Sequence, residues 1–80
     1  LPSSRVTALA QDAGGWLWVG TSEGLARWDG LRFERYTPEA GAPLPVTLLE
    51  VGADDALWIG VEGGGLWRLA ADRRQWRHYH

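Results

Sequence analysis

The chain repeats a short apolar segment at a spacing that suits one type of fold. Leu17-Trp18-Val19-Gly20 recurs 40 residues later as Leu57-Trp58-Ile59-Gly60. A repeat of about 40 to 45 residues is typical of β-propellers, in which each repeat is a four-stranded blade. The duplication therefore predicts that the 80 residues comprise two copies of one structural unit.

Each unit has the pattern of four short strands separated by turns. In the first unit, residues 12–15 and Asp29-Gly30 are turn signals, and residues 16–21 are mostly apolar at consecutive positions, as in a strand covered on both faces. The apolar residues show no sustained period near 3.6, which argues against helices. We therefore expect an all-β fold of two four-stranded antiparallel sheets, with Asp29-Gly30 as a tight two-residue hairpin loop.

A proline-rich segment separates the two units. Residues 38–45 contain three prolines and one glycine, too many breakers for a strand or a helix. We expect a first blade at residues 1–37, a linker at 38–45 and a second blade at 46–80. The spacing between matched residues grows from 40 to 43 within the second unit, which places its insertions in turns.

Charge and composition argue against several classes of function. The net charge is −2, with basic and acidic residues intermixed, so the chain offers no basic surface for nucleic acid. No apolar stretch approaches the length of about 18 residues that a membrane helix requires. The chain has no cysteine, which excludes disulfides and thiolate metal sites.

Both units resemble the two-component regulator propeller repeat, whose usual pattern runs Leu-Pro, a Val-led strand, an Asp and Gly turn, Leu-Trp-(Ile/Val)-Gly-Thr, Gly-Leu and an aromatic-bearing outer strand. The matching residues of the first unit are Leu1-Pro2, Val6, Asp12, Gly15, Leu17–Thr21, 24–27, Phe33 and Tyr36. Those of the second unit are Leu44-Pro45, Val46, 57–60, 64–68, Trp76 and Tyr79. The second unit departs from the pattern with Gly52 in place of Asp12 and Val61 in place of Thr21.

The resemblance implies propeller blades like those in the sensor portions of bacterial hybrid histidine kinases, which are periplasmic or extracellular. Because propellers have about four to eight blades, two blades cannot close a ring and leave an apolar face at each end. We therefore expect a homo-oligomer, in which three chains give six blades or four chains give eight. The expected function is that of a non-enzymatic propeller fragment or design that self-assembles into a ring and is related to a ligand-sensing domain.

The aromatic residues fall into two groups. Trp16 and Trp67 have alanine counterparts, Ala56 and Ala26, so the repeat itself does not call for an indole there, and they are the candidates for ligand contact. They leave open a second function, a small oligomeric lectin-like propeller that binds a glycan or another small molecule. The other group is expected to pack between blades and comprises Trp18, Trp58, Trp28, Trp76, Phe33, Tyr36 and Tyr79.

Metal-binding and catalytic patterns are incomplete in the sequence. His78 and His80 share one face of an expected strand but have no third ligand at a suitable spacing, and Asp54-Asp55 lacks the remainder of a calcium loop. The glycine run 63–65 lacks the Lys-Ser/Thr ending of a phosphate-binding loop, and the chain has no Gly-x-Ser-x-Gly. We therefore expect no metal, no cofactor, no catalytic residue and no enzymatic activity.

Overall fold

The computed structural model describes residues 5–38 and 45–79, and the regular structure in them consists of β-strands. The strands are β1 (Val6–Gln11), β2 (Leu17–Thr21), β3 (Gly24–Trp28), β4 (Phe33–Tyr36), β5 (Val46–Val51), β6 (Leu57–Val61), β7 (Gly65–Leu69) and β8 (Trp76–Tyr79). Sheet 1 has the order β1-β2-β3-β4 and sheet 2 the order β5-β6-β7-β8, and all neighbours are antiparallel. The prediction of two four-stranded antiparallel sheets is confirmed. Most of the expected linker, residues 39–44, lies outside the described residues.

The connection between β3 and β4 differs from the sequence-based prediction. It is a turn of four residues, 29–32, closed by a 3.3 Å hydrogen bond from the amide of Asp29 to the carbonyl of Arg32. Oδ1 of Asp29 also accepts hydrogen bonds from the amides of Leu31 and Arg32. Gly30 has a φ of 102°. The two-residue loop was therefore the wrong prediction, because the aspartate side chain organises a longer turn.

The first strand of each sheet is irregular at a threonine. The register shifts between Val6 and Ala8 in β1, and between Val46 and Leu48 in β5. In β1 the Thr7 hydroxyl lies 2.6 Å from the carbonyl oxygen of Val46, to which it donates, and 3.1 Å from that of Gly20. The irregularity thus turns a polar side chain toward the other sheet and ties β1 to β5.

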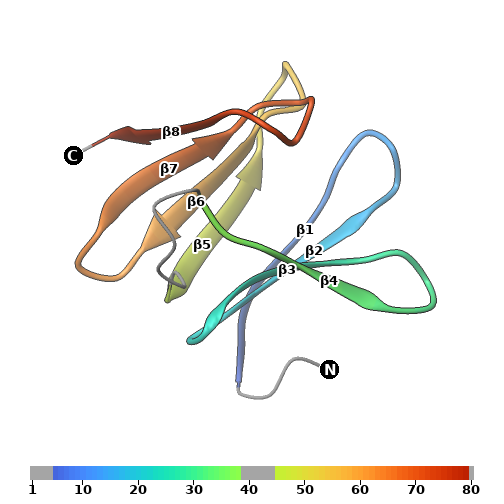
Figure 1. Ribbon diagram of the computed structural model, residues 1–80, viewed down its shortest axis with the longest axis horizontal. Helices are drawn as coiled ribbons and strands as arrows, with labels where there is room; N and C mark the ends of the chain where they lie inside the picture. Colours follow the sequence, from blue (N-terminus) through green and yellow to red (C-terminus); the bar gives the residue numbers. More distant parts are fainter. Residues whose placement is uncertain (1–4, 39–44, 80) are drawn as a thin grey trace.

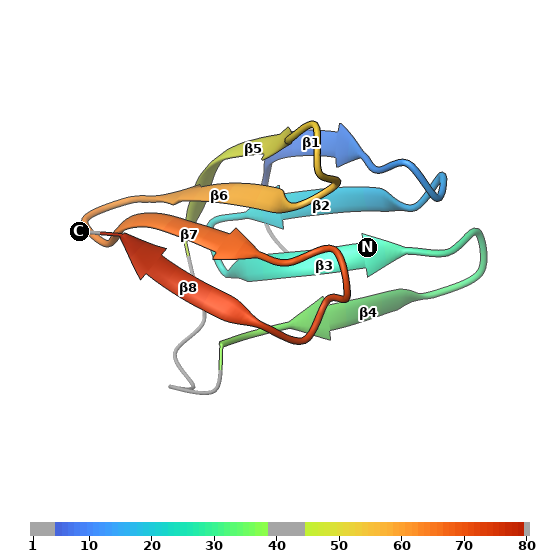
Figure 2. The same ribbon diagram turned by 90° about the horizontal axis from the view of Figure 1, so that it is seen from above.

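The two sheets pack face to face. Figures 1 and 2 show them side by side, with β1 of sheet 1 next to β5 of sheet 2, and β5 also contacts β2. The core between them is a cluster of seven buried hydrophobic side chains: Trp18, Leu25, Val46, Leu49, Leu57, Ile59 and Leu69. Because the first two belong to sheet 1 and the other five to sheet 2, each sheet contributes one face to a shared core.

Gly20 permits the close approach of the two sheets. A Cβ atom at this position would lie 2.4 Å from Cγ1 and 2.9 Å from Cβ of Val46, and Val46 is 1% exposed. A side chain here would force β2 and β5 apart. The glycine of the repeated segment is therefore required where the sheets meet.

Side chains alternate between the two faces of each strand, so packing the sheets together leaves two faces uncovered. In sheet 1 the face that bears Trp18 and Leu25 is covered, whereas the opposite face bears Leu17 and Val19. In sheet 2 the covered face bears Leu57 and the uncovered one Trp58. We call these uncovered surfaces the open face of sheet 1 and the open face of sheet 2.

Candidate functional site

A buried carboxylate, that of Asp12, joins the two sheets at the end that bears the β1–β2 and β7–β8 turns. Within sheet 1, Oδ1 of Asp12 accepts hydrogen bonds from the amides of Gly14 and Trp16, both at 3.0 Å. Oδ2 accepts from Nε1 of Trp18 at 2.9 Å and from the guanidinium of Arg73, in sheet 2, at 3.0 Å. The side chain of Asp12 is 3% exposed and that of Arg73 10%. The ion pair is therefore shielded from water and fully hydrogen-bonded on its acidic side.

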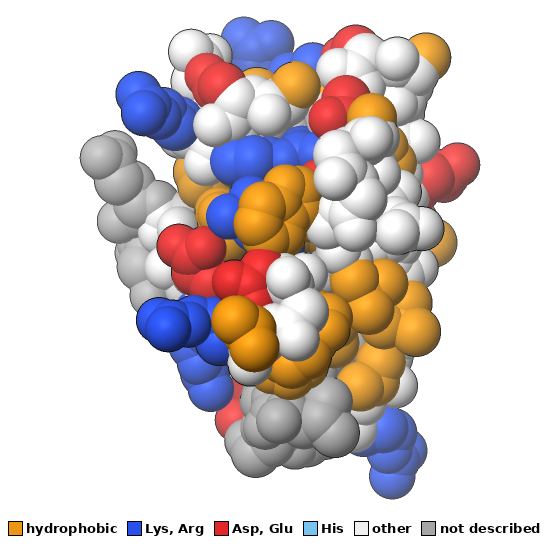
Figure 3. All heavy atoms as spheres, turned by 90° about the vertical axis from the view of Figure 1, so that its right-hand side faces the viewer, with side chains coloured by type: hydrophobic (Ala, Val, Ile, Leu, Met, Phe, Trp, Pro, Cys, Tyr) orange, Lys and Arg blue, Asp and Glu red, His pale blue; other side chains and the backbone are white. Residues whose placement is uncertain are grey.

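A second carboxylate of sheet 2 completes this group. Oδ1 of Asp55 accepts a 2.9 Å hydrogen bond from the amide of Ala13, and its Oδ2 lies 3.5 Å from the guanidinium of Arg73. That guanidinium also lies over the ring of Trp18, 5.2 Å from its centroid. We refer to Asp12, Trp18, Asp55 and Arg73 as the junction cluster. Figure 3 looks onto the side of the β1–β2 and β3–β4 turns and shows acidic and basic side chains beside hydrophobic ones.

Two residues of the junction cluster adopt backbone conformations that favour glycine. Asp55 has a φ of 63° and Arg73 a φ of 61°, whereas their counterparts in sheet 1, Gly15 and Gly30, have φ values of 88° and 102°. A side chain in this region costs about 1 kcal/mol or more. Both side chains make contacts with sheet 1 that favour these conformations, Asp55 with the amide of Ala13 and Arg73 with Asp12.

The environment of Asp12 favours its ionised form. Burial alone would raise its pKa, but the hydrogen bonds from Trp18, Arg73 and the amide of Trp16, together with the charge of Arg73, lower the pKa below the usual 3.8. The carboxylate is therefore negative at neutral pH, as the ion pair requires.

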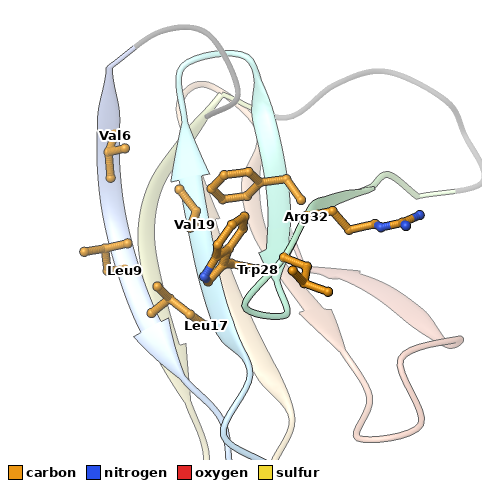
Figure 4. A pocket seen from close by; sticks show the side chains of 8 residues that line it. Val6, Leu9, Leu17, Val19, Trp28 and Arg32 are labelled. Atoms are coloured by element: carbon orange, nitrogen blue, oxygen red, sulfur yellow. The ribbon is translucent and has the colours of Figure 1, made fainter.

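The open face of sheet 1 is a broad apolar hollow of about 770 Å³. Its lining comprises Val6, Leu9, Leu17, Val19, Trp28, Leu31, Arg32 and Phe33. Figure 4 shows the labelled apolar side chains on one side of the sheet, with Arg32 extending away from them. Trp28 and Phe33 pack together with ring centroids 4.6 Å apart. A hydrophobic surface of this kind is typical of an interaction site.

The open face of sheet 2 carries an aromatic pair and an ion pair. Leu48 and Tyr79 are 50% and 39% exposed, and the Tyr79 ring packs against Trp58 with centroids 5.5 Å apart. The guanidinium of Arg68 lies over the Trp58 ring and donates a 2.6 Å hydrogen bond to Asp54. The covered face of sheet 1 has the equivalent Trp18–Tyr36 pair, at 4.8 Å. The two faces therefore present related aromatic pairs, one covered and one open.

The residues expected to pack between blades thus divide into three places. Trp18, Tyr36 and Trp76 belong to, or pack against, the core between the sheets. Trp28 and Phe33 line the hollow on the open face of sheet 1. Trp58 and Tyr79 lie on the open face of sheet 2, where packing against a further blade stays a prediction.

The two tryptophans expected to contact a ligand have neighbours on their rings. Trp16 is 37% exposed, but the guanidinium of Arg27 lies 4.1 Å from its ring centroid. Trp67 packs against the core. The His78 ring stacks on the Trp67 ring, with the two centroids 4.2 Å apart and an interplanar angle of 4°. Both indoles therefore have a ring face occupied by a side chain of this chain.

The positions considered for metal binding are engaged in other contacts or lie outside the structure. His78 contacts the carbonyl oxygen of Gly64 through Nε2, and His80 lies outside the described residues. Asp54 and Asp55 pair with Arg68 and Arg73. In residues 5–38 and 45–79, no three His, Cys, Asp or Glu side chains are grouped as metal ligands would be. No helix in these residues is long and apolar enough to cross a membrane.

Sequence reasoning missed the junction cluster. Its signals in the sequence are Asp12, which Gly52 replaces in the second unit, and the replacement of two turn glycines, Gly15 and Gly30, by Asp55 and Arg73. Even with these signals, the partner of Arg73 lies 61 residues away in the sequence.

Comparison with known protein families connects the first unit to a propeller repeat. The family model described as "Two component regulator propeller" matches residues 1–23. This stretch includes β1, β2 and Asp12 of the junction cluster. The chain is thus similar to this propeller repeat over part of its first unit, whereas a second family repeat and a kinase context stay predictions. Neither the curated proteins nor the solved structures contain a significant match to the chain.

Proposed function

We propose that the chain is a non-enzymatic pair of propeller blades that closes a ring by binding further copies of itself head to tail. In this assembly, the open face of sheet 2 of one copy packs on the open face of sheet 1 of the next. The contact between sheets 1 and 2 within the chain is the template for this joint. A relationship to ligand-sensing propellers is supported by the partial family match.

One observation carries the proposal: apolar residues that are buried in sheet 2, where sheet 1 covers them, have counterparts in sheet 1 that lie exposed on its open face. Val46 and Leu49 of β5 are 1% and 8% exposed because sheet 1 covers them, whereas their counterparts in β1, Val6 and Leu9, are 40% and 59% exposed. Leu57 is likewise 0% exposed, whereas its counterpart Leu17 is only partly buried and lines the open hollow. Ile59 and its counterpart Val19 are both buried, although Val19 also lines the hollow. The open face of sheet 1 therefore has the composition of a surface that is covered in sheet 2.

The open face of sheet 2 likewise matches a covered face, that of sheet 1. Trp18 and Gly20 of sheet 1 receive sheet 2, and Trp58 and Gly60 occupy the matched positions on the open face of sheet 2. A face of this type is thus available to receive the open face of sheet 1. Because the two surfaces differ, the contact is heterologous and closes into a ring when the rotation per copy allows it.

The oligomeric mass tests this function. Native mass spectrometry at micromolar concentration is expected to show three or four copies of the 8.9 kDa chain, corresponding to six or eight blades. A monomer at that concentration would overturn the proposal. A dimer would contradict the expected six or eight blades, because two copies supply only four.

The carbohydrate-binding alternative has no specific observation in its favour. The ring of Trp16 is covered on one side by Arg27, and Trp67 is stacked against His78. We therefore do not propose it.

A further inference from the structure

The charged contact that joins the two sheets is missing where one copy would meet the next. Within the chain, Arg73 of the β7–β8 turn pairs with Asp12 of the β1–β2 turn. In the proposed ring, the β3–β4 turn of one copy faces the β5–β6 turn of its neighbour in the same way. The neighbour has Gly52 at the place of Asp12, and Gly30 stands at the place of Arg73. The joint between copies therefore lacks both members of the buried pair.

The match between Gly30 and Arg73 rests on local geometry. Asp29 and Asp72 each accept hydrogen bonds at Oδ1 from the amides two and three residues later. The residue after each aspartate, Gly30 or Arg73, has a positive φ. The two turns thus share one framework, in which only the second supplies a cation at this position.

Each of the facing turns carries a charge of the required sign two residues further along. In the β5–β6 turn this is Asp54, two residues after Gly52, and Oδ1 of Asp54 accepts from the amide of Ala56 at 3.1 Å. Oδ1 of Asp12 accepts from the matched amide, that of Trp16, at 3.0 Å. In the β5–β6 turn, Asp54 therefore accepts a hydrogen bond equivalent to one that Asp12 accepts in the β1–β2 turn. It does so although it stands two residues after Gly52, the counterpart of Asp12.

In the β3–β4 turn the displaced cation is Arg32, two residues after Gly30. It is exposed, lines the rim of the hollow and extends away from the apolar side chains in Figure 4. Among the described residues, its guanidinium makes no ion pair or hydrogen bond, and its charge acts on Asp29 of the same turn only through a longer-range attraction. The cation is thus available for a partner beyond this chain.

We infer that Arg32 of one copy pairs with Asp54 of the next copy, in place of the pair that Arg73 and Asp12 form within the chain. This inference rests on the proposed self-assembly. Asp54 retains its contact with Arg68, since a carboxylate accepts several hydrogen bonds at its two oxygens. The Arg32–Asp54 pair orients the two copies and disfavours the joining of two faces of like charge.

The two pairs are accessible to salt at different stages. Asp12 and Arg73 are nearly buried within each folded copy, whereas before two copies meet the side chain of Asp54 is 58% exposed and Arg32 lies on the surface. Exposed ion pairs are screened by salt to a greater extent than buried ones. Added salt is therefore expected to weaken the electrostatic part of the joint between copies while the fold of each copy remains.

A double-mutant cycle tests the pair. Arg32→Glu is expected to raise the protein concentration required for ring assembly about tenfold, because the new carboxylate would face Asp54 of the next copy. In the Asp54→Asn background the same substitution is expected to have less than about a threefold effect, because the opposing negative charge is gone. Arg74→Glu is the matched control, since Arg74 is an exposed arginine in the β7–β8 turn, and it is expected to leave assembly unchanged.

The cycle distinguishes this inference from the proposed function. Assembly is measured by native mass spectrometry across a dilution series, and circular dichroism verifies that each variant is folded. An equal effect of Arg32→Glu in both backgrounds, or no effect, would overturn the Arg32–Asp54 pair while leaving the ring intact. A monomeric unmodified chain would instead overturn the ring itself before any variant is compared.

Discussion

At the scale of single residues, the side chain of Asp12 connects its own turn to the other sheet. Its two oxygens accept four hydrogen bonds, from Gly14, Trp16, Trp18 and Arg73, and the last of these crosses between the sheets. Loss of its charge would leave the nearly buried guanidinium of Arg73 with Asp55, at 3.5 Å, as its remaining charged partner. Asp12 therefore links the β1–β2 turn of sheet 1 to the cation of the β7–β8 turn.

The substitution Asp12→Asn is expected to lower the free energy of unfolding by about 2–4 kcal/mol, as when one partner of a buried ion pair is removed. Urea denaturation at a fixed protein concentration measures the effect. Asp72→Asn is the control, because Asp72 is an exposed turn aspartate that bonds only within its own turn, and it is expected to cost less. Equal losses in the two variants would show that the Asp12–Arg73 pair has no special role.

The pH dependence provides a second check on Asp12. Its pKa is lower in the folded chain, so its contribution is present above the unfolded pKa of 3.8 and is lost as the pH falls toward the folded value. Asp29, Asp54 and Asp72 also have lowered pKa values and add to the loss in acid. Asp12→Asn is therefore expected to show a shallower decline in urea midpoint between about pH 5 and pH 3 than the unmodified chain.

At the scale of the elements, the approach of β2 to β5 depends on a residue without a side chain. Gly20→Ala is expected to destabilise the chain by about 1–3 kcal/mol, because the added methyl group overlaps Val46 and an overpacked interior must shift. Thermal unfolding followed by circular dichroism measures the loss.

Gly60→Ala is the matched substitution on the open face. There the nearest atoms to an added Cβ are Cβ of Leu48, at 3.0 Å, and Oγ1 of Thr47, at 3.3 Å, both within sheet 2. We expect a smaller effect on the fold of one copy and a larger one on assembly, since Gly60 would receive β1 of the next copy. An unchanged oligomer for Gly60→Ala would argue against close packing at that face.

At the scale of the whole molecule, substitutions at two matched leucines are expected to affect different properties, the fold at one position and the assembly at the other. Leu49 is buried between the sheets, whereas its counterpart Leu9 is 59% exposed on the open face. Leu49→Asp is expected to cost about 3–5 kcal/mol, through lost apolar burial and the desolvation of a charge. Leu9→Asp is expected to leave the fold of each copy nearly unchanged and to abolish the ring.

Circular dichroism and native mass spectrometry together measure this difference. The informative result for Leu9→Asp is a folded monomer. A folded Leu9→Asp variant that retained the native oligomeric mass would show that the open face of sheet 1 is not the joint, and the head-to-tail arrangement would then be wrong.

The local architecture could be read from the sequence because it depends on short-range patterns. Mostly apolar residues in 16–21, turn glycines and a repeat of 40 residues predicted antiparallel sheets, and strand pairing across short turns follows from such signals. The β3–β4 turn was predicted with the wrong length, because the side chain of Asp29 binds two amides of the turn. That choice depends on a side-chain geometry that the Asp-Gly dipeptide does not specify.

Only the tertiary structure decided which aromatic residues are covered and which charges meet. The repeat treats Trp18 and Trp58 as equivalent, yet the first packs between the sheets and the second lies on an open face, because a pair of sheets buries only two of its four faces. Arg73 reaches Asp12 only when the sheets stack, across 61 residues of sequence. By itself the sequence determined the repeated sheet and its turns through local periodicity. The junction and the two open faces were decided by the packing of one sheet on the other.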